Sequence, residues 1–248
     1  MRAAPPIERM FMPHIVTSFD TELQKLSALV IDMGATVGTQ IEDAATAFRT
    51  RDMQLAAKVR ATDKMVDALQ MRIEERVISV IAKRQPLAID LRDTIATLKI
   101  ATDLERMGDL AKNNAKRIIE IGEHAQPAGI GANLDLLSQR AHEQLSQVMQ
   151  AYARRDKALA RQVWESDGAI DTMHTALFRE LLTYMMEDPR SIGYCTHLLF
   201  CAKNLERIGD HATNIAENIH YIVTGEFLSG DRPKGDSPIA AGTAPETP

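Results

Sequence analysis

A seven-residue motif occurs once in each half of this chain and constrains the possible fold more than any other feature. Residues 103–109 read DLERMGD and residues 204–210 read NLERIGD, so the two copies lie 101 positions apart. Both copies fall within a helical pattern of apolar residues. Repetition of a local sequence in a similar setting indicates that the protein is one unit built twice.

The spacing of apolar residues predicts a protein made of helices. Apolar side chains recur every three or four residues in six long segments, which is typical of amphipathic helices. Aromatic residues make up only 4% of the chain, whereas strands favour aromatic and β-branched residues. Asp52 and Asp156 are expected to cap the second and fifth helices, and Pro86 and Asp188-Pro189 to end them. The predicted class is all-α, with two tandem three-helix bundles.

The six segments divide into two repeats of three helices. The first repeat is expected at residues 14–125 and the second at 132–226, joined by a linker rich in Pro and Gly at 126–131. Residues 229–248 are rich in Pro, Gly, Ser, Thr and charge, and we expect a disordered tail there. The expected helices run from about Phe19 to Phe48, Asp52 to Pro86, Asp90 to Ile121, Asn133 to Arg154, Asp156 to Asp188 and through Leu198 to Gly225.

Charge and hydropathy exclude several classes of protein. A net charge of −5 argues against a general nucleic-acid binder, which needs a basic surface. No apolar run approaches the roughly 18–20 residues that cross a bilayer, and the N-terminus lacks a signal-peptide pattern. We therefore expect a cytoplasmic protein without direct membrane insertion. Phosphate loops, dinucleotide fingerprints and catalytic triads are missing from the sequence, so we do not expect an enzyme.

The motif carboxylates are expected to meet a second set of carboxylates across each helical hairpin. Asp67 lies as far before Pro86 as Glu105 lies after it, and Asp63 and Asp109 are placed in the same way. In the second half, Asp171 with Glu206 and Asp167 with Asp210 are symmetric about the Asp188-Pro189 junction. At about 100° per residue, all these pairs fall on one flank of their apolar stripes. Each half should therefore carry an acidic groove on or near its surface.

Four converging carboxylates repel one another unless a cation lies between them. Oxygen ligands suit Mg²⁺, Ca²⁺, Mn²⁺ or iron better than zinc. We therefore predict cation binding by eight residues: Asp63, Asp67, Glu105, Asp109, Asp167, Asp171, Glu206 and Asp210. The glycines of the motif, Gly108 and Gly209, stand inside helices, where close helix approach or access to the carboxylates would explain them.

Two alternatives stay open from the residues alone. Acidic side chains are common on solvated helix faces, and Arg106 and Arg207 could neutralise part of the charge, so a metal-free helical scaffold is one alternative. The other is a carboxylate-bridged metal-dependent hydrolase or oxidase. Glu217 and His220 have the E-x-x-H spacing of di-iron helices, but that architecture needs two such motifs, and Asp171 with His174 is the only other near match.

These residues resemble the PhoU family, the bacterial accessory and regulatory proteins of phosphate-specific transport. The resemblance covers about residues 14–225, and its motifs occur in order in both halves. It implies two three-helix bundles related by a pseudo-twofold axis, with E(D)-x-x-x-D motifs that bind metal ions or small metal clusters. The matching segments are Phe19-Asp20, Glu22-Leu23, Arg84 through Arg92, Leu98 through Asp109 and Asn204 through Glu217.

The resemblance also implies a function. A PhoU-like protein is expected to repress phosphate uptake and the phosphate-starvation genes by linking the ATPase subunit of a phosphate ABC transporter to a sensor histidine kinase. It is expected to form a homodimer and to bind divalent or iron-type ions (Mg, Mn, Fe or Zn). The two copies differ, since Asp103 becomes Asn204 and Leu110 becomes His211, so the two metal sites are expected to differ in affinity or nuclearity.

Overall fold

The computed structural model describes residues 12–87, 89–122 and 131–228, and all regular structure in these ranges is helical. The predicted all-α class is confirmed. The predicted tail and all of the predicted linker except Gly131 lie outside the described residues. The elements are α1 (Met12–Thr50), α2 (Met53–Arg84), α3 (Ile89–Ile121), α4 (Ala132–Arg154), α5 (Lys157–Glu165), α6 (Asp167–Glu187), the 3₁₀ turn η2 (Pro189–Ser191) and α7 (Ile192–Thr224).

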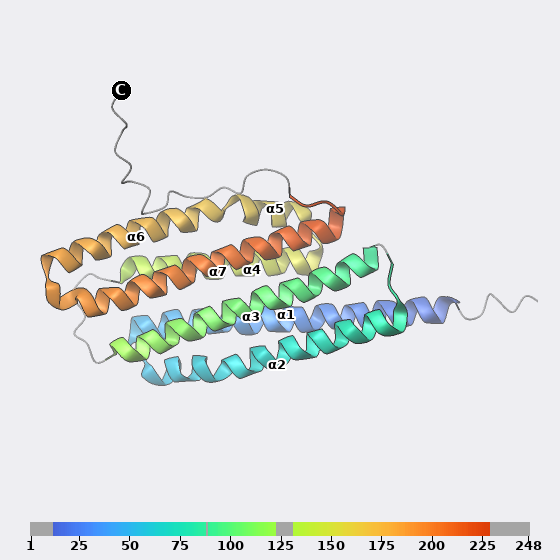
Figure 1. Ribbon diagram of the computed structural model, residues 1–248, viewed down its shortest axis with the longest axis horizontal. Coiled ribbons are helices and arrows are strands. Elements are labelled where there is room, and N and C mark those ends of the chain that lie inside the picture. Colours follow the sequence, from blue (N-terminus) through green and yellow to red (C-terminus); the bar gives the residue numbers. More distant parts are fainter. Residues whose placement is uncertain (1–11, 88, 123–130, 229–248) are drawn as a thin grey trace, which may run out of the picture.

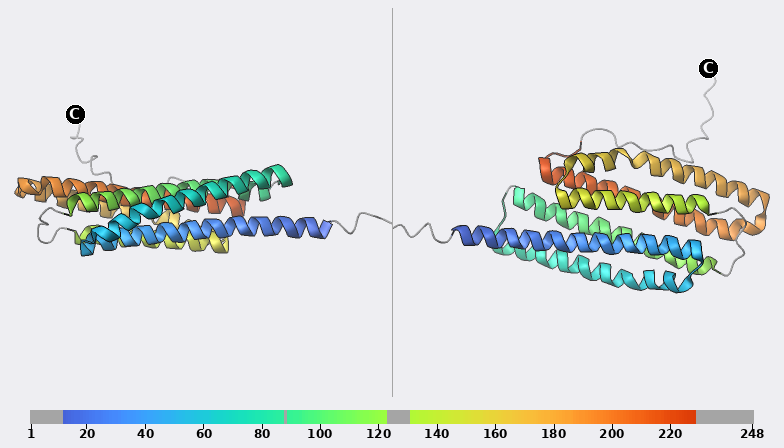
Figure 2. Two further views of the ribbon diagram at one scale, coloured as in Figure 1. Left: turned by 90° about the horizontal axis from the view of Figure 1, so that it is seen from below. Right: turned by 180° about the vertical axis from the view of Figure 1, so that it is seen from behind.

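The helices form two bundles that lie side by side. The first bundle contains α1, α2 and α3, and the second contains α4, α7 and the pair α5 and α6, which together take the place of one long helix (Figure 1). Of all described helices, α3 and α7 contact each other most extensively, and α1 packs beside α4 in a second layer (Figure 2). Each bundle thus contributes two helices to the interface. None of the helices in the described ranges has the length and apolarity that a bilayer span requires.

The ends of the helices follow local signals in the sequence. The Asp52 side chain accepts hydrogen bonds from two backbone N–H groups in the first turn of α2, and Asp156 does the same for α5. Gln85 ends α2 in the left-handed region (φ 47°), immediately before Pro86. Gly225 ends α7 with φ 82°, a conformation that glycine adopts without strain. The predicted caps and breaks are confirmed.

The fifth predicted helix differs from the prediction because it is interrupted at Ser166. The Ser166 hydroxyl donates a hydrogen bond of 2.8 Å to the carbonyl oxygen of Val163, and its backbone N–H bonds the preceding turn. Such local hydrogen bonds compete with the helical ladder. The interruption makes Asp167 the first residue of α6. A carboxylate is favoured at a helix N-terminus because of the partial positive charge there.

One continuous apolar core joins the two bundles. The apolar residues that recur every three or four positions along α3 and α7 are buried, as the amphipathic pattern predicts. These residues are Ile100, Leu104, Met107, Ala111, Ile118 and Ile121 in α3, and Leu198, Leu205, Ile208, Ala212, Ile215, Ile219 and Ile222 in α7. With the stripes inside, the acidic residues of the motif copies remain at the flanks of the core.

Candidate functional site

The hairpin of α2 and α3 brings four carboxylates together, and we call Asp63, Asp67, Glu105 and Asp109 the first carboxylate cluster. Burial raises the pKa of Glu105 above its usual value of 4.5. Arg106 opposes this shift, whereas Asp109, Asp67 and Asp63 all add to it. Asp63, Asp67 and Asp109 are therefore near enough to Glu105 to act on it electrostatically, as the symmetry about Pro86 predicts.

A lysine that sequence reasoning did not single out lies within this cluster. The Lys112 Nζ atom is 2.5 Å from Asp63 Oδ2 and 2.5 Å from Asp109 Oδ1. Burial disfavours the ammonium form, but the hydrogen bonds to Asp109 and Asp63 prevail and raise the pKa of Lys112 above its usual value. Lys112 is therefore protonated at neutral pH. The signal for it was its position three residues after Asp109, which places both on one helix face.

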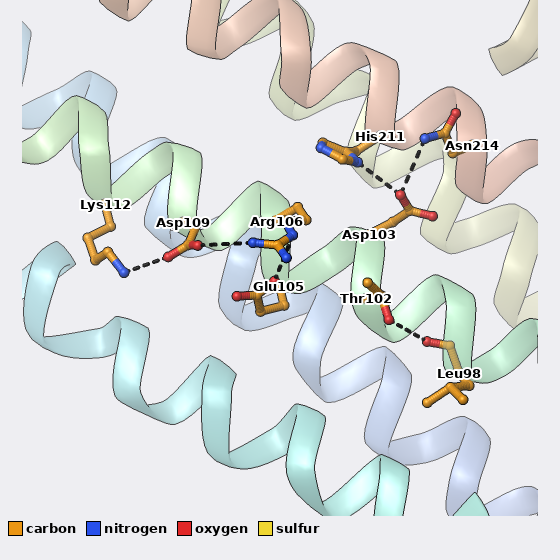
Figure 3. A network of polar contacts seen from close by, with 9 residues as sticks. All are labelled: Leu98, Thr102, Asp103, Glu105, Arg106, Asp109, Lys112, His211 and Asn214. Carbon is orange, nitrogen blue, oxygen red and sulfur yellow. Dashed lines mark hydrogen bonds and ion pairs between the residues drawn. The ribbon is translucent and has the colours of Figure 1, made fainter.

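Arg106 contributes less to the first cluster than Lys112 does. Its guanidinium atoms lie 3.5 Å from Glu105 Oε2 and 3.8 Å from Asp109 Oδ2 (Figure 3). The Arg106 side chain is mostly exposed, and such ion pairs are worth only about 0–1 kcal/mol. Neutralisation of the first cluster by Arg106, which the sequence had left open, is therefore minor.

The hairpin of α6 and α7 carries the second carboxylate cluster, Asp167, Asp171, Glu206 and Asp210. Burial raises the pKa of Glu206, and Asp210 and Asp171 add to this shift. The hydrogen bond from Lys203 opposes it, with Nζ 2.7 Å from Oε1 of Glu206. Lys203 lies one turn before Glu206 on the same helix and is half exposed.

Asp63 and Asp167 are the buried members of the two clusters, with exposed fractions of only 6% and 2%. The prediction of surface grooves is therefore wrong for these two residues. Asp63 lies four residues after Val59 and three before Val66, both of which are buried. This spacing places Asp63 on the inner face of α2, whereas the sequence had predicted it on the flank of the apolar stripe. The same spacing relates Asp167 to the buried Val163 and Ile170.

Asp167 has a different partner from its counterpart. Thr213 Oγ1 donates a hydrogen bond of 3.0 Å to Asp167 Oδ1. Thr213 follows Asp210 by three residues, as Lys112 follows Asp109. One position of the repeat therefore supplies an ammonium group to the first cluster and a neutral hydroxyl group to the second.

A histidine that the sequence singled out only as a near match to the di-iron spacing, His174, lies beside the second cluster. His174 is buried on α6, and burial lowers its pKa. Lys203 lowers it further, while Asp171 raises it. The imidazole is therefore neutral at pH 7, the form that binds metal ions. The other histidine pattern, Glu217 with His220, is engaged elsewhere, because Glu217 accepts a hydrogen bond from the Trp164 indole at 3.0 Å.

The first position of each motif copy, Asp103 or Asn204, lies at the contact between the bundles, as does His211, which directly follows the second copy. Asp103 Oδ1 lies 2.9 Å from His211 Nδ1 and accepts a hydrogen bond of 3.3 Å from Asn214. Asn204, the counterpart of Asp103, donates to Asn114 at 2.8 Å. Figure 3 shows Asp103 on the side of α3 that faces α7, away from Glu105. The exchanges at these positions thus act on the interface of α3 and α7, not directly on either cluster.

The glycines of the motif allow a close approach of neighbouring helices, one of the two explanations expected from the sequence. A Cβ atom on Gly108 would lie 3.1 Å from Gln40 Oε1 and 3.3 Å from Val66. A Cβ atom on Gly209 would lie 2.9 Å from Ile170 and 3.1 Å from Gln144 Oε1. Each motif therefore packs against a buried glutamine from the first helix of its bundle.

The donor atoms decide how well each cluster suits a metal ion. In their present positions, the His, Cys, Asp and Glu side chains of the described residues form no group of three or more that could hold a metal ion. The first cluster fits poorly because Lys112 occupies the space between Asp63 and Asp109. The second fits better in its chemistry, since it offers carboxylates and a neutral imidazole. Gln144 lies beside Gly209 and is only 3% exposed. Neither the nitrogen nor the oxygen of its side-chain amide has a hydrogen-bond partner among the described residues.

Comparison with known proteins places this arrangement in a family. The family model described as PhoU domain matches the chain twice, at residues 30–118 and 134–219. The chain is 47% identical over 230 residues to the phosphate-specific transport system accessory protein PhoU homolog of Rhizobium meliloti (strain 1021), covering 93% of this chain and 97% of that protein.

Two solved structures are similar to this one. PhoU from Pseudomonas aeruginosa superposes with a TM-score of 0.81 and 36% identity over 84% of this chain and 100% of that chain. The phosphate transport system regulatory protein PhoU from Streptococcus pneumoniae gives a TM-score of 0.79 and 27% identity over 85% and 99% of the two chains. These relatives are accessory or regulatory proteins and not enzymes. The chain therefore belongs to the PhoU family.

Proposed function

We propose that this PhoU-family protein, an accessory and regulatory protein of phosphate transport, is a cytoplasmic adaptor that represses phosphate uptake and the phosphate-starvation genes. It would link the ATPase subunit of a phosphate ABC transporter to a sensor histidine kinase and would act as a homodimer. The observation that carries the proposal is the near full-length similarity to a phosphate-specific transport accessory protein. As a member of a non-enzymatic family, the chain would act through contacts with other proteins and not by turnover.

An adaptor needs separate surfaces for its partners, and the two hairpin ends offer them. Leu87 and Ile89 are largely exposed where α2 turns into α3, and Met186 and Ile192 are exposed where α6 turns into α7. These two turns lie at opposite ends of the molecule (Figure 1). Exposed apolar side chains that gather at one place are typical of protein contact sites. This arrangement supports simultaneous contact with two partners.

The test of this function is genetic complementation in phosphate-rich medium. Deleting the gene should raise phosphate uptake and starvation-gene expression, and the wild-type gene should restore repression. Leu87→Asp with Ile89→Asp should fail to restore it, because charge opposes docking of an apolar surface. Met71→Asp is the matched control, since Met71 is an exposed apolar residue in the middle of α2. Unchanged uptake and expression after deletion would refute the adaptor function.

The second part of the proposal is that the protein binds a divalent or iron-type ion (Mg, Mn, Fe or Zn) at the second carboxylate cluster. Asp171, Glu206 and Asp210 with the deeper Asp167 would hold it. When bound, the ion would neutralise these carboxylates and join α6 to α7. The raised pKa of Glu206, caused by burial and reinforced by Asp210 and Asp171, supports this because a nearby cation would relieve the cost of its charge.

Metal binding can be tested apart from the biological role. Elemental analysis of gently purified protein should find bound metal, and Glu206→Gln with Asp210→Asn should remove it. Mn²⁺ or Mg²⁺ should also raise the melting temperature of the wild-type protein but not that of this variant. A metal-free scaffold would show neither bound metal nor a change in melting temperature.

A further inference from the structure

We infer that Lys112 is the cation of the first carboxylate cluster, so that the two repeats are neutralised differently: the first by its own ammonium group and the second by a metal ion. The inference deepens the proposed function and rests on it for metal binding at the second cluster. For the first cluster it rests on this chain's own side chains.

The position of Lys112 excludes a metal ion between Asp63 and Asp109. Its Nζ atom makes ion pairs of 2.5 Å with one oxygen of each carboxylate. A metal ion bound by the same oxygens would need to approach them to about 2.0–2.6 Å. The ammonium and the ion would then occupy the same space and would repel each other as like charges. One of the two must leave.

The Lys112 ammonium group is held firmly because it forms an ion pair with the buried carboxylate of Asp63. The Asp63 side chain is only 8% exposed, whereas Asp109 and Lys112 are each 32% exposed. A buried carboxylate without a partner is costly, and Lys112 reaches Asp63 from the neighbouring helix. Moving Lys112 aside to admit a metal ion would separate this pair. A divalent ion at the first cluster therefore has to compete with a tethered cation.

The second repeat has no ammonium group at the position that corresponds to Lys112, because that residue is Thr213. Thr213 is neutral, fully buried and too short to lie between two carboxylates, and it donates only a hydroxyl group to Asp167. Lys203 pairs with Glu206 from the preceding turn of α7 and is half exposed, so it can swing into solvent. At this position the second cluster therefore has no ammonium group that would exclude an added ion.

The experiment counts Mn²⁺ ions bound by variants at position 112. Lys112→Met keeps the length of the side chain and removes its charge, and Lys112→Arg keeps the charge. Lys116→Met is the matched control, because Lys116 lies one turn further along α3, is exposed, and pairs only loosely with Glu120 at 3.8 Å. Binding is measured by equilibrium dialysis followed by elemental analysis, beginning from protein stripped with chelator.

Lys112→Met should bind about one more Mn²⁺ per chain than the wild-type protein. Lys112→Arg and Lys116→Met should bind as the wild type does. Adding Asp67→Asn with Glu105→Gln to Lys112→Met should abolish the gain, which assigns the new ion to the first cluster. In the wild-type background the same two substitutions should leave Mn²⁺ binding unchanged, and this comparison needs no substitution at Lys112.

Two results would overturn the inference. One is a Lys112→Met protein that folds and binds no more Mn²⁺ than the wild type. The other is a loss of Mn²⁺ from the wild type upon Asp67→Asn with Glu105→Gln, which would show that the first cluster already holds an ion. If instead the wild type binds no Mn²⁺ and Lys112→Met gains an ion, Lys112 has the inferred role and the proposed metal site at the second cluster fails.

Discussion

Replacing Thr213 with valine tests how the buried carboxylate of the second cluster is stabilised. The change substitutes a methyl group for a hydroxyl group of similar size. It removes the 3.0 Å hydrogen bond to Asp167 and a 3.1 Å contact with the carbonyl oxygen of Gly209 on the same helix. Thr213 and Asp167 are both at most 2% exposed, so water cannot take over as donor. A hydrogen bond to a charged group contributes about 1.5–3 kcal/mol. For a protein of this size the melting temperature should fall by about 3–12 °C.

The assay is thermal and denaturant unfolding in chelator, so that metal binding does not mask the loss. Thr172→Val is the matched control, because the exposed Thr172 bonds only a carbonyl of its own helix, and it should change stability by less than about 0.5 kcal/mol. In an Asp167→Asn background, Thr213→Val should cost less than in the wild type, since the buried charge is gone. An equal loss in both backgrounds, or a loss no larger than that of Thr172→Val, would refute the reasoning.

Further substitutions probe the glycines, the interface and the titration of Glu206. Urea unfolding should show that Gly209→Ala lowers the free energy of unfolding by about 1 kcal/mol, because the new Cβ atom would lie 2.9 Å from Ile170. Gly193→Ala should instead raise the free energy of unfolding by about 0.5–1 kcal/mol, because no atom lies within 4 Å of its new Cβ atom. Asp103→Ala should destabilise the contact of α3 with α7 by about 1–3 kcal/mol and leave Mn²⁺ binding unchanged; altered Mn²⁺ stoichiometry would contradict the separation of interface and clusters. In the fold, burial, reinforced by Asp210, raises the pKa of Glu206, so its ionisation above that pKa lowers stability at neutral pH. Glu206→Gln should therefore raise the melting temperature of chelated protein at pH 7. The gain should shrink as the pH falls below 4.5, the usual pKa of glutamate, because the side chain then becomes protonated in both states. A gain of equal size at acidic and neutral pH would contradict this.

The parts of the structure that could be predicted are those set by local chemistry and by the rise of a helix. Asp52 caps α2 because its side chain reaches two N–H groups in the next turn, and no distant residue takes part. Asp67 and Glu105 lie level with each other because α2 and α3 meet at the turn around Pro86 and each helix rises by the same distance per residue. The turn alone fixes which residues come level, so a sequence without coordinates could place them.

The parts that could not be predicted depend on small rotations and on flexible side chains. Neighbouring residues of a helix point about 100° apart. This difference of one position is why Asp63 is buried in the bundle, while the adjacent Thr62 is only partly buried. The break at Ser166 could not be read from periodicity, because Val163 and Ile170 on either side of it are both buried in the same core. The Lys112 ammonium can adopt many rotamers, and only the packing of α2 against α3 brings Asp63 within its reach.

The contrast between Lys112 and Thr213 shows why a repeated motif does not by itself define a repeated site. Both copies contain the same Glu and Asp, and each copy packs against a buried glutamine. The electrostatic surroundings of the two copies nevertheless differ one helical turn beyond the motif. The equivalent position there is the positively charged Lys112 in the first repeat and the neutral Thr213 in the second. Because a tethered ammonium is present at all metal concentrations, the first repeat would keep its shape when metal is scarce. Any response of this protein to metal would then originate in the hairpin of α6 and α7.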